Sequence, residues 1–252
     1  MRLAVLTLWL LTVTEAKNPT LMNNKTLKKV ATPIFILITA ILWITVTFIY
    51  GNKFIAYSCV LTCFLFSLLF FKSEKLVLVQ VVALLFTCGA DVFLILLEGE
   101  LKTLAMVIFL CAQVCYAIKT LLFANSKRER LIQIILRVSL SIVGGTAVLV
   151  VLKAQAQALF VISVIYYVNL ILSAVFSFIH FNEGTNQKLT AIGLTLFALC
   201  DVTIGFDFLI DIFSLSSKSF LYKLTHLPFS LVHLFYYPSQ TLLSLSVLTK
   251  SK

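Results

Sequence analysis

Long apolar runs separated by short polar gaps follow one another along most of the chain. A helix that crosses a bilayer needs roughly 20 predominantly apolar residues, and most of these runs approach that length. The pattern therefore predicts an all-α polytopic membrane protein with about eight transmembrane helices, which could be arranged as two four-helix halves. The expected spans are approximately residues 33–50, 54–71, 76–97, 103–124, 131–152, 156–180, 188–212 and 228–248.

The composition supports the same class. Hydrophobic residues make up 61% of the chain and charged residues 12%, with a mean hydropathy of +1.07, whereas a soluble domain is about half apolar. The net charge of +10 comes from basic residues that lie mainly in the gaps, where they set orientation and contact anionic headgroups. We therefore expect these basic residues to interact with a lipid bilayer and not with nucleic acid. The six cysteines lie inside apolar runs without metal-ligand spacing, and we expect neither a metal nor another cofactor.

The N-terminal segment, residues 1–32, differs from the rest. Residues 1–16 form a short apolar stretch that resembles a signal peptide or an interfacial helix, and a basic polar stretch with the sequon at Asn24 follows. Residues 33–252 are expected to form a single membrane domain. The greater number of lysines and arginines on one side predicts cytosolic termini, in the endoplasmic reticulum membrane if the cell is eukaryotic. A cleaved signal peptide would instead place Asn24 in the lumen.

Two aspartates stand inside runs that are otherwise apolar. Asp91 and Asp201 are each followed by valine, and they lie at similar depths in two expected spans of the same direction. A charge at the bilayer centre costs at least about 2.5–3.5 kcal/mol, so such residues usually face a cavity and carry function. The matching depth could reflect an internal duplication of a four-helix unit.

Two carboxyl groups that share an apolar cavity do not both ionise readily. One remains an acid and the other a carboxylate, which is the division of roles in an acid/base hydrolase. A purely structural alternative is that each aspartate hydrogen-bonds a neighbouring helix or pairs with a buried base such as Arg137. The sequence contains no GxSxG, HExxH or Walker motif that would indicate other hydrolytic machinery.

A set of glycine, aromatic and polar residues accompanies the two aspartates in their own and other spans: Gly89, Asp91, Val92, Phe93, Leu94, Phe109, Tyr116, Tyr167, Gly193, Phe197, Asp201, Tyr236, Tyr237 and Gln240. These residues resemble the signatures of the YhhN-like lysoplasmalogenase family of eight-span membrane proteins, over roughly residues 33–248. Three positions depart from the family pattern: Ala90 replaces a glycine, Gln113 a histidine and Cys200 a serine.

The resemblance implies hydrolysis of the vinyl ether bond of a lysoplasmalogen to a fatty aldehyde and a glycerophospho-base, with a lysophospholipid as the substrate. Asp91 and Asp201 would be the catalytic acid/base pair, without a cofactor. The polar residues expected to orient the carboxyl groups or bind the substrate are Gln113, Tyr116, Tyr167, Asn169, Tyr237 and Gln240.

Other readings of the two aspartates remain open. They could bind an ion or a proton in a transporter or proton-coupled carrier, or the chain could be a catalytically silent lipid-binding member in which Gln113 marks the lost activity. An intramembrane aspartyl protease fits less well, because its Gly-x-Gly-Asp and Pro-Ala-Leu motifs are not present. Headgroup preference and oligomeric state are left open.

Overall fold

The computed structural model describes residues 24–49, 52–97, 101–152, 158–213, 216–217 and 219–249. The expectations for residues 1–16 and for the two termini lie outside this range. The chain divides into two compact units, Met1–Ile34 and Phe35–Lys252, and the candidate site belongs to the second unit.

The described residues are helical and contain no strand, which confirms the all-α prediction. Several helices carry local start signals. The Asn52 side chain accepts a hydrogen bond from Phe54 N at 2.8 Å ahead of α3, and Ser230 caps α10 by accepting one from His233 N at 3.3 Å. The α-helices are α2 (Asn24–Ile44), α3 (Lys53–Leu69), α4 (Lys75–Asp91), α5 (Lys102–Phe123), α6 (Lys127–Leu152), α7 (Ala158–Ile179), α8 (Thr185–Phe213), α9 (Phe220–Thr225) and α10 (Leu231–Leu245). Shorter π or 3-10 segments are η1 (Thr45–Ile49), η2 (Val92–Leu96), η4 (Phe181–Glu183) and η5 (Ser246–Leu248).

Several helices are long and apolar enough to cross a membrane, which supports a multi-pass membrane protein. Within the described residues there are six such candidates. Two of the expected spans are shorter: α3 has 17 residues and α10 has 15. The count of about eight spans therefore stays a prediction. The candidate spans are Thr26–Ile49, Lys75–Leu96, Lys102–Phe123, Lys127–Val151, Ala158–Ile179 and Thr185–Phe208.

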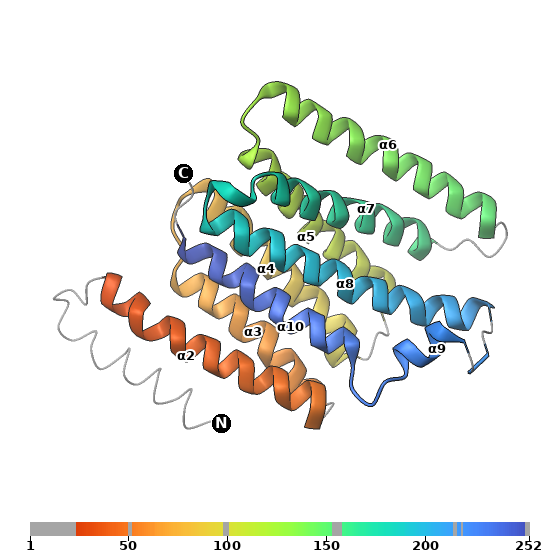
Figure 1. Cartoon of the computed structure of the whole chain (residues 1–252), viewed down its shortest axis with the longest axis horizontal. Helices are drawn as coiled ribbons and strands as arrows, with labels where there is room; N and C mark the ends of the chain where they lie inside the picture. Colours follow the sequence, from red (N-terminus) through yellow and green to blue (C-terminus); the bar gives the residue numbers. More distant parts are fainter. Residues whose placement is uncertain are drawn as a thin grey trace. The chain divides into compact units, whose positions relative to one another are not determined.

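Six helices pack in a closed ring, in which each contacts the next in the order α3, α4, α5, α7, α8 and α10, with α10 returning to α3. Helix α6 lies beside α7, outside this ring (Figure 1). The contact between α8 and α10 is very close at Gly193, where a Cβ atom would lie 2.9 Å from Leu243 Cγ and 3.3 Å from the Ser239 carbonyl oxygen. Gly193 therefore allows the two helices that carry much of the site to approach each other.

Buried polar side chains join the helices near one end of the ring. Lys119 is fully buried in α5, and its ammonium group donates hydrogen bonds to Gln80 Oε1 and Thr190 Oγ1, both at 2.7 Å, and to Ser246 Oγ at 3.1 Å. These contacts connect α5 with α4, α8 and η5. The role of Lys119 is not recognisable from the sequence, because a single lysine near the end of an apolar run resembles an interfacial residue.

A histidine between two glutamates joins the first turn of α6 to the α7–α8 connection. His180 Nδ1 lies 2.6 Å from Glu183 Oε1, and its Nε2 lies 2.6 Å from Glu129 Oε1. Burial alone would lower the pKa of His180, but the hydrogen bonds to the two glutamates and their negative charges outweigh burial. The pKa of His180 is therefore raised above its ordinary value.

Candidate active site

Each aspartate accepts a hydrogen bond from a tyrosine on a neighbouring helix. Tyr236 of α10 donates its hydroxyl hydrogen to Asp91 Oδ2 at 2.5 Å, and Tyr166 of α7 donates to Asp201 Oδ2 at the same distance. Both tyrosines are buried, Asp91 is only 2% exposed, and Asp201 is partly buried. These bonds engage Oδ2 of each carboxyl group and hold the two groups in defined orientations.

The backbone changes its geometry at Asp91, which is the last residue of α4. The π-helix η2 (Val92–Leu96) begins at the next residue, and the Leu97 N–H donates to the carbonyl oxygen of Val92 at 3.0 Å. Such π-helical turns within helices are frequent at functional sites, because they redirect side chains. Here the change in winding follows immediately after the carboxyl group.

Aromatic rings connect the two aspartate–tyrosine pairs. The ring of Phe197 lies 5.5 Å from that of Tyr236, the ring of Phe109 lies 6.1 Å from that of Tyr166, and Phe109 and Phe197 are 6.1 Å apart. A row of aromatic contacts therefore leads from the partner of Asp91 to the partner of Asp201.

Four of the polar residues proposed from the sequence are fully or almost fully buried in the same helix ring: Gln113, Tyr116, Tyr237 and Gln240. The Gln113 amide lies near the Tyr166 hydroxyl, and Tyr237 lies near enough to Asp91 to interact electrostatically.

Several of their polar atoms have no hydrogen-bond partner of standard geometry among the described residues. These are both amide heteroatoms of Gln113, the hydroxyls of Tyr116 and Tyr237, and Oε1 of Gln240. The Tyr116 hydroxyl lies near Gln80 and Thr87, and the Gln113 amide lies near Tyr166. Because buried polar atoms in proteins nearly always have partners, the Tyr237 hydroxyl and Gln240 Oε1 are the atoms best suited to bind a polar ligand or water.

Tyr167 and Asn169, the remaining two residues predicted from the sequence, are only partly buried. Tyr167 interacts electrostatically with Asp201. The Asn169 amide donates to the Ile165 carbonyl at 2.8 Å and accepts from Arg137 Nη1 at 3.3 Å. The described hydrogen bonds of Asn169 thus join α6 and α7.

Arg137 does not pair with either aspartate. Its guanidinium donates to Thr120 Oγ1 at 2.9 Å, to the Asn169 carbonyl at 3.0 Å and to Ser173 Oγ at 3.1 Å. The pairing with Arg137 that the sequence left open is therefore wrong. Each aspartate instead accepts a hydrogen bond from a tyrosine of a neighbouring helix, and this contact is compatible with a structural role and with a catalytic role.

Tyr166 and Tyr236 are the direct partners that sequence analysis did not select as site residues. Each belongs to a Tyr-Tyr doublet, of which the second member, Tyr167 or Tyr237, was predicted as the site residue from the sequence. Adjacent residues in a helix point about 100° apart, so usually only one member of a doublet faces a given neighbour. Helical spacing from His233 and Gln240 fits both Tyr236 and Tyr237, so the pattern leaves the choice undecided.

The fold and this pair of tyrosine-bound aspartates define a polytopic all-α membrane protein with a buried carboxyl site. A family model described as the YhhN family matches residues 52–247, and the chain belongs to this family, which is the lysoplasmalogenase family. The resemblance inferred from the motifs is confirmed, although the match begins after the first expected span. The family is associated with hydrolase activity. No curated protein and no solved structure matches the chain.

Proposed function

We propose that this protein hydrolyses the vinyl ether bond of lysoplasmalogens, with Asp91 and Asp201 as the acid/base pair. The observation that carries the proposal is the geometry of the two carboxyl groups. Each accepts a hydrogen bond from a tyrosine hydroxyl at 2.5 Å, and contacts between aromatic rings link the two aspartate–tyrosine pairs. Membership of the lysoplasmalogenase family supports the same reaction class.

The reaction begins with proton transfer to carbon. The protonated aspartic acid donates its proton to the β-carbon of the vinyl ether, and the α-carbon becomes an oxocarbenium ion. The ionised aspartate stabilises this cation and removes a proton from the water that attacks the α-carbon. The second aspartate, now protonated, then donates its proton to the departing glycerol oxygen, while the first, now ionised, removes the hydroxyl proton of the hemiacetal, which separates into aldehyde and alcohol. One water molecule is consumed, and both carboxyl groups return to their starting protonation states.

The difference in burial supports one assignment of the starting roles. Asp91 is 2% exposed, and complete burial favours the neutral form of a carboxyl group, so Asp91 acts as the acid. Asp201 is less buried and is better placed to act as the carboxylate that meets water. Gln113 can donate and accept hydrogen bonds but cannot transfer a proton at neutral pH, so the proton transfers fall to the two aspartates alone.

The test is aldehyde release from 1-alkenyl-lysophosphatidylethanolamine by the purified protein. Asp91→Asn and Asp201→Asn should each lower kcat by about a hundred-fold or more, the usual contribution of a general acid or base. Glu74→Gln is the matched control, because it removes an exposed carboxylate at the start of α4, away from the site. A folded wild-type protein that turns over neither ethanolamine nor choline substrates would refute the proposal and favour the carrier or silent-binder readings.

A further inference from the structure

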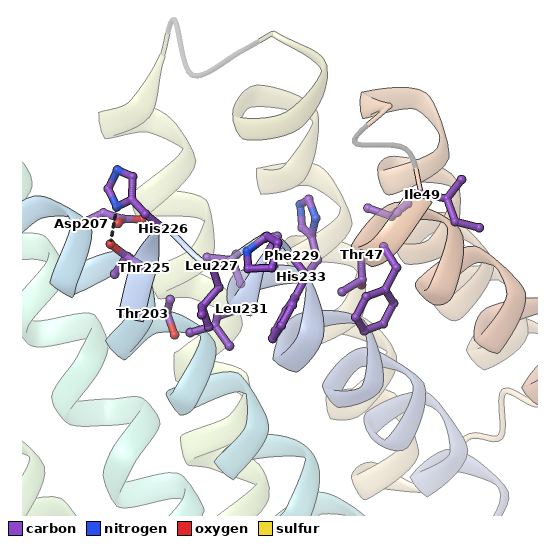
Figure 2. A pocket seen from close by; sticks show the side chains of 15 residues that line it. Thr47, Ile49, Thr203, Asp207, Thr225, His226, Leu227, Phe229, Leu231 and His233 are labelled. Atoms are coloured by element: carbon purple, nitrogen blue, oxygen red, sulfur yellow. Dashed lines mark hydrogen bonds between the residues drawn. The ribbon is translucent and has the colours of Figure 1, made fainter. Parts of the chain in front are cut away.

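A cavity of about 590 Å³ opens beside the first turn of α10. Its walls come from η1, the second half of α8, the α9–α10 connection and α10 itself (Figure 2). We call it the α10 pocket. Its volume lies within the range of about 300–1,000 Å³ that is usual for small-molecule sites.

The α10 pocket lies next to the carboxyl site. His233 lines the pocket and precedes Tyr236, the partner of Asp91, by three residues, which is about 4.5 Å along the helix axis. The ring of His233 is 5.4 Å from that of Tyr237. On the opposite helix, Thr203 lines the pocket two residues after Asp201. The pocket therefore borders the turns of α8 and α10 that lead to the carboxyl site.

One side of the pocket is suited to an anion. Ser230 Oγ accepts from His233 N, while the N–H groups of Leu231 and Val232 belong to the first turn of α10 and have no intrahelical acceptor. Thr47 is only 5% exposed, and its hydroxyl has no hydrogen-bond partner among the described residues. The same is true of His233 Nδ1. A phosphate group would accept hydrogen bonds from the two N–H groups and the Thr47 hydroxyl, and from His233 when Nδ1 carries the proton.

The other side of the pocket presents a carboxylate. Figure 2 shows Asp207 and His226 at one side and Thr47 and His233 at the other. Asp207 is exposed on α8, so its charge can meet a ligand without a large desolvation cost. An anion alone would be repelled by Asp207, whereas a zwitterion matches both sides.

We propose that the α10 pocket binds the zwitterionic phospho-amine headgroup of the lysophospholipid. This inference rests on the proposed function for the identity of the lipid. The phosphate lies at the first turn of α10 with Thr47 and His233, and the ammonium group lies at Asp207. The glycerol then extends toward Asp91 and Asp201. Asp207 is thus a specificity-determining residue that favours headgroups with an amine.

The experiment measures binding, so that it is independent of catalysis. The probes are 1-O-alkyl-lysophosphatidylethanolamine, a saturated ether without the reactive double bond, and 1-O-alkyl-lysophosphatidate, which lacks the amine. Wild-type protein in detergent should prefer the amine lipid by about three- to ten-fold, as expected for one partly exposed charge-assisted contact. Asp207→Asn should reduce this preference to near parity, and Glu74→Gln, which removes an exposed carboxylate elsewhere, should retain it.

A second variant tests the phosphate side. Thr47→Val keeps the shape of the side chain and should weaken the binding of both lipids by a similar factor. The ratio of the two affinities should therefore stay the same. A preference that survives Asp207→Asn, or a Thr47→Val variant that binds both lipids as the wild type does, would overturn the assignment. Phosphoethanolamine that binds as tightly as the lipid would also overturn it, because the pocket would then be a site for the free headgroup.

The outcomes separate this inference from the proposed function. Asp207-dependent binding of the saturated lipid, together with no aldehyde release from the alkenyl lipid, would refute the hydrolase and leave the pocket assignment standing. Aldehyde release by a protein whose headgroup preference does not change in Asp207→Asn would refute the pocket assignment and leave the hydrolase proposal standing.

Discussion

Replacement of Tyr236 by phenylalanine isolates the contribution of one hydroxyl to the proposed reaction. The hydroxyl donates to Asp91 Oδ2 at 2.5 Å, and the phenylalanine ring can keep the contacts at 5.5 Å with Phe197 and Tyr237. Asp91 becomes charged as it gives up its proton in the proposed transition state, and a hydrogen bond to a charged group contributes about 1.5–3 kcal/mol. At 1.36 kcal/mol for each factor of ten, Tyr236→Phe should lower kcat by about 10- to 150-fold.

The adjacent tyrosine provides the comparison. The hydroxyl of Tyr237 is equally buried but donates to neither aspartate, so we expect Tyr237→Phe to act mainly on KM if this hydroxyl contacts substrate. Steady-state kinetics of aldehyde release on both variants separate kcat from KM, and the same comparison applies to Tyr166→Phe and Tyr167→Phe. If Tyr236→Phe retained its kcat, or if Tyr237→Phe lowered kcat as strongly, the tyrosine–aspartate pairing would have no catalytic role.

Three further predictions concern stability. Lys119→Ala should lower the free energy of unfolding by about 2–5 kcal/mol, because three buried acceptors lose their donor. Thermal unfolding in detergent measures this loss of stability. An unchanged unfolding midpoint would contradict the role of Lys119. The raised pKa of His180 means that its contribution is fully present below about pH 6.5 and is lost as pH rises through the folded pKa. Wild-type protein should therefore lose stability between pH 6 and 9 by more than His180→Gln, and parallel pH profiles would disprove this. Gly193→Ala should destabilise the protein by about 1–3 kcal/mol through overpacking against α10, whereas a Cβ at Gly205 meets nothing within 4 Å. Equal melting temperatures for Gly193→Ala and Gly205→Ala would show that the close helix contact does not constrain the fold.

Local patterns were sufficient for the secondary structure and the class of protein. Hydropathy over roughly 20 residues decides whether a helix is stable in a bilayer, and this property depends on neighbouring residues rather than on the fold. Boundaries were less well predicted. The first run was expected to begin near residue 33, but α2 begins at Asn24, because lysines are good helix formers even where they are too polar for a span.

The sequence by itself identified the two aspartates, because a carboxyl group inside an apolar run carries a cost that demands a partner or a function. Their partners required the tertiary structure. Tyr236 lies 145 residues from Asp91 and Tyr166 lies 35 residues from Asp201, and only the rotation of each helix decides which member of a tyrosine doublet faces the carboxyl group. The contacts of Lys119 and the α10 pocket depend on tertiary structure for the same reason. They are made by residues from several helices, whose relative positions follow from packing between segments distant in sequence.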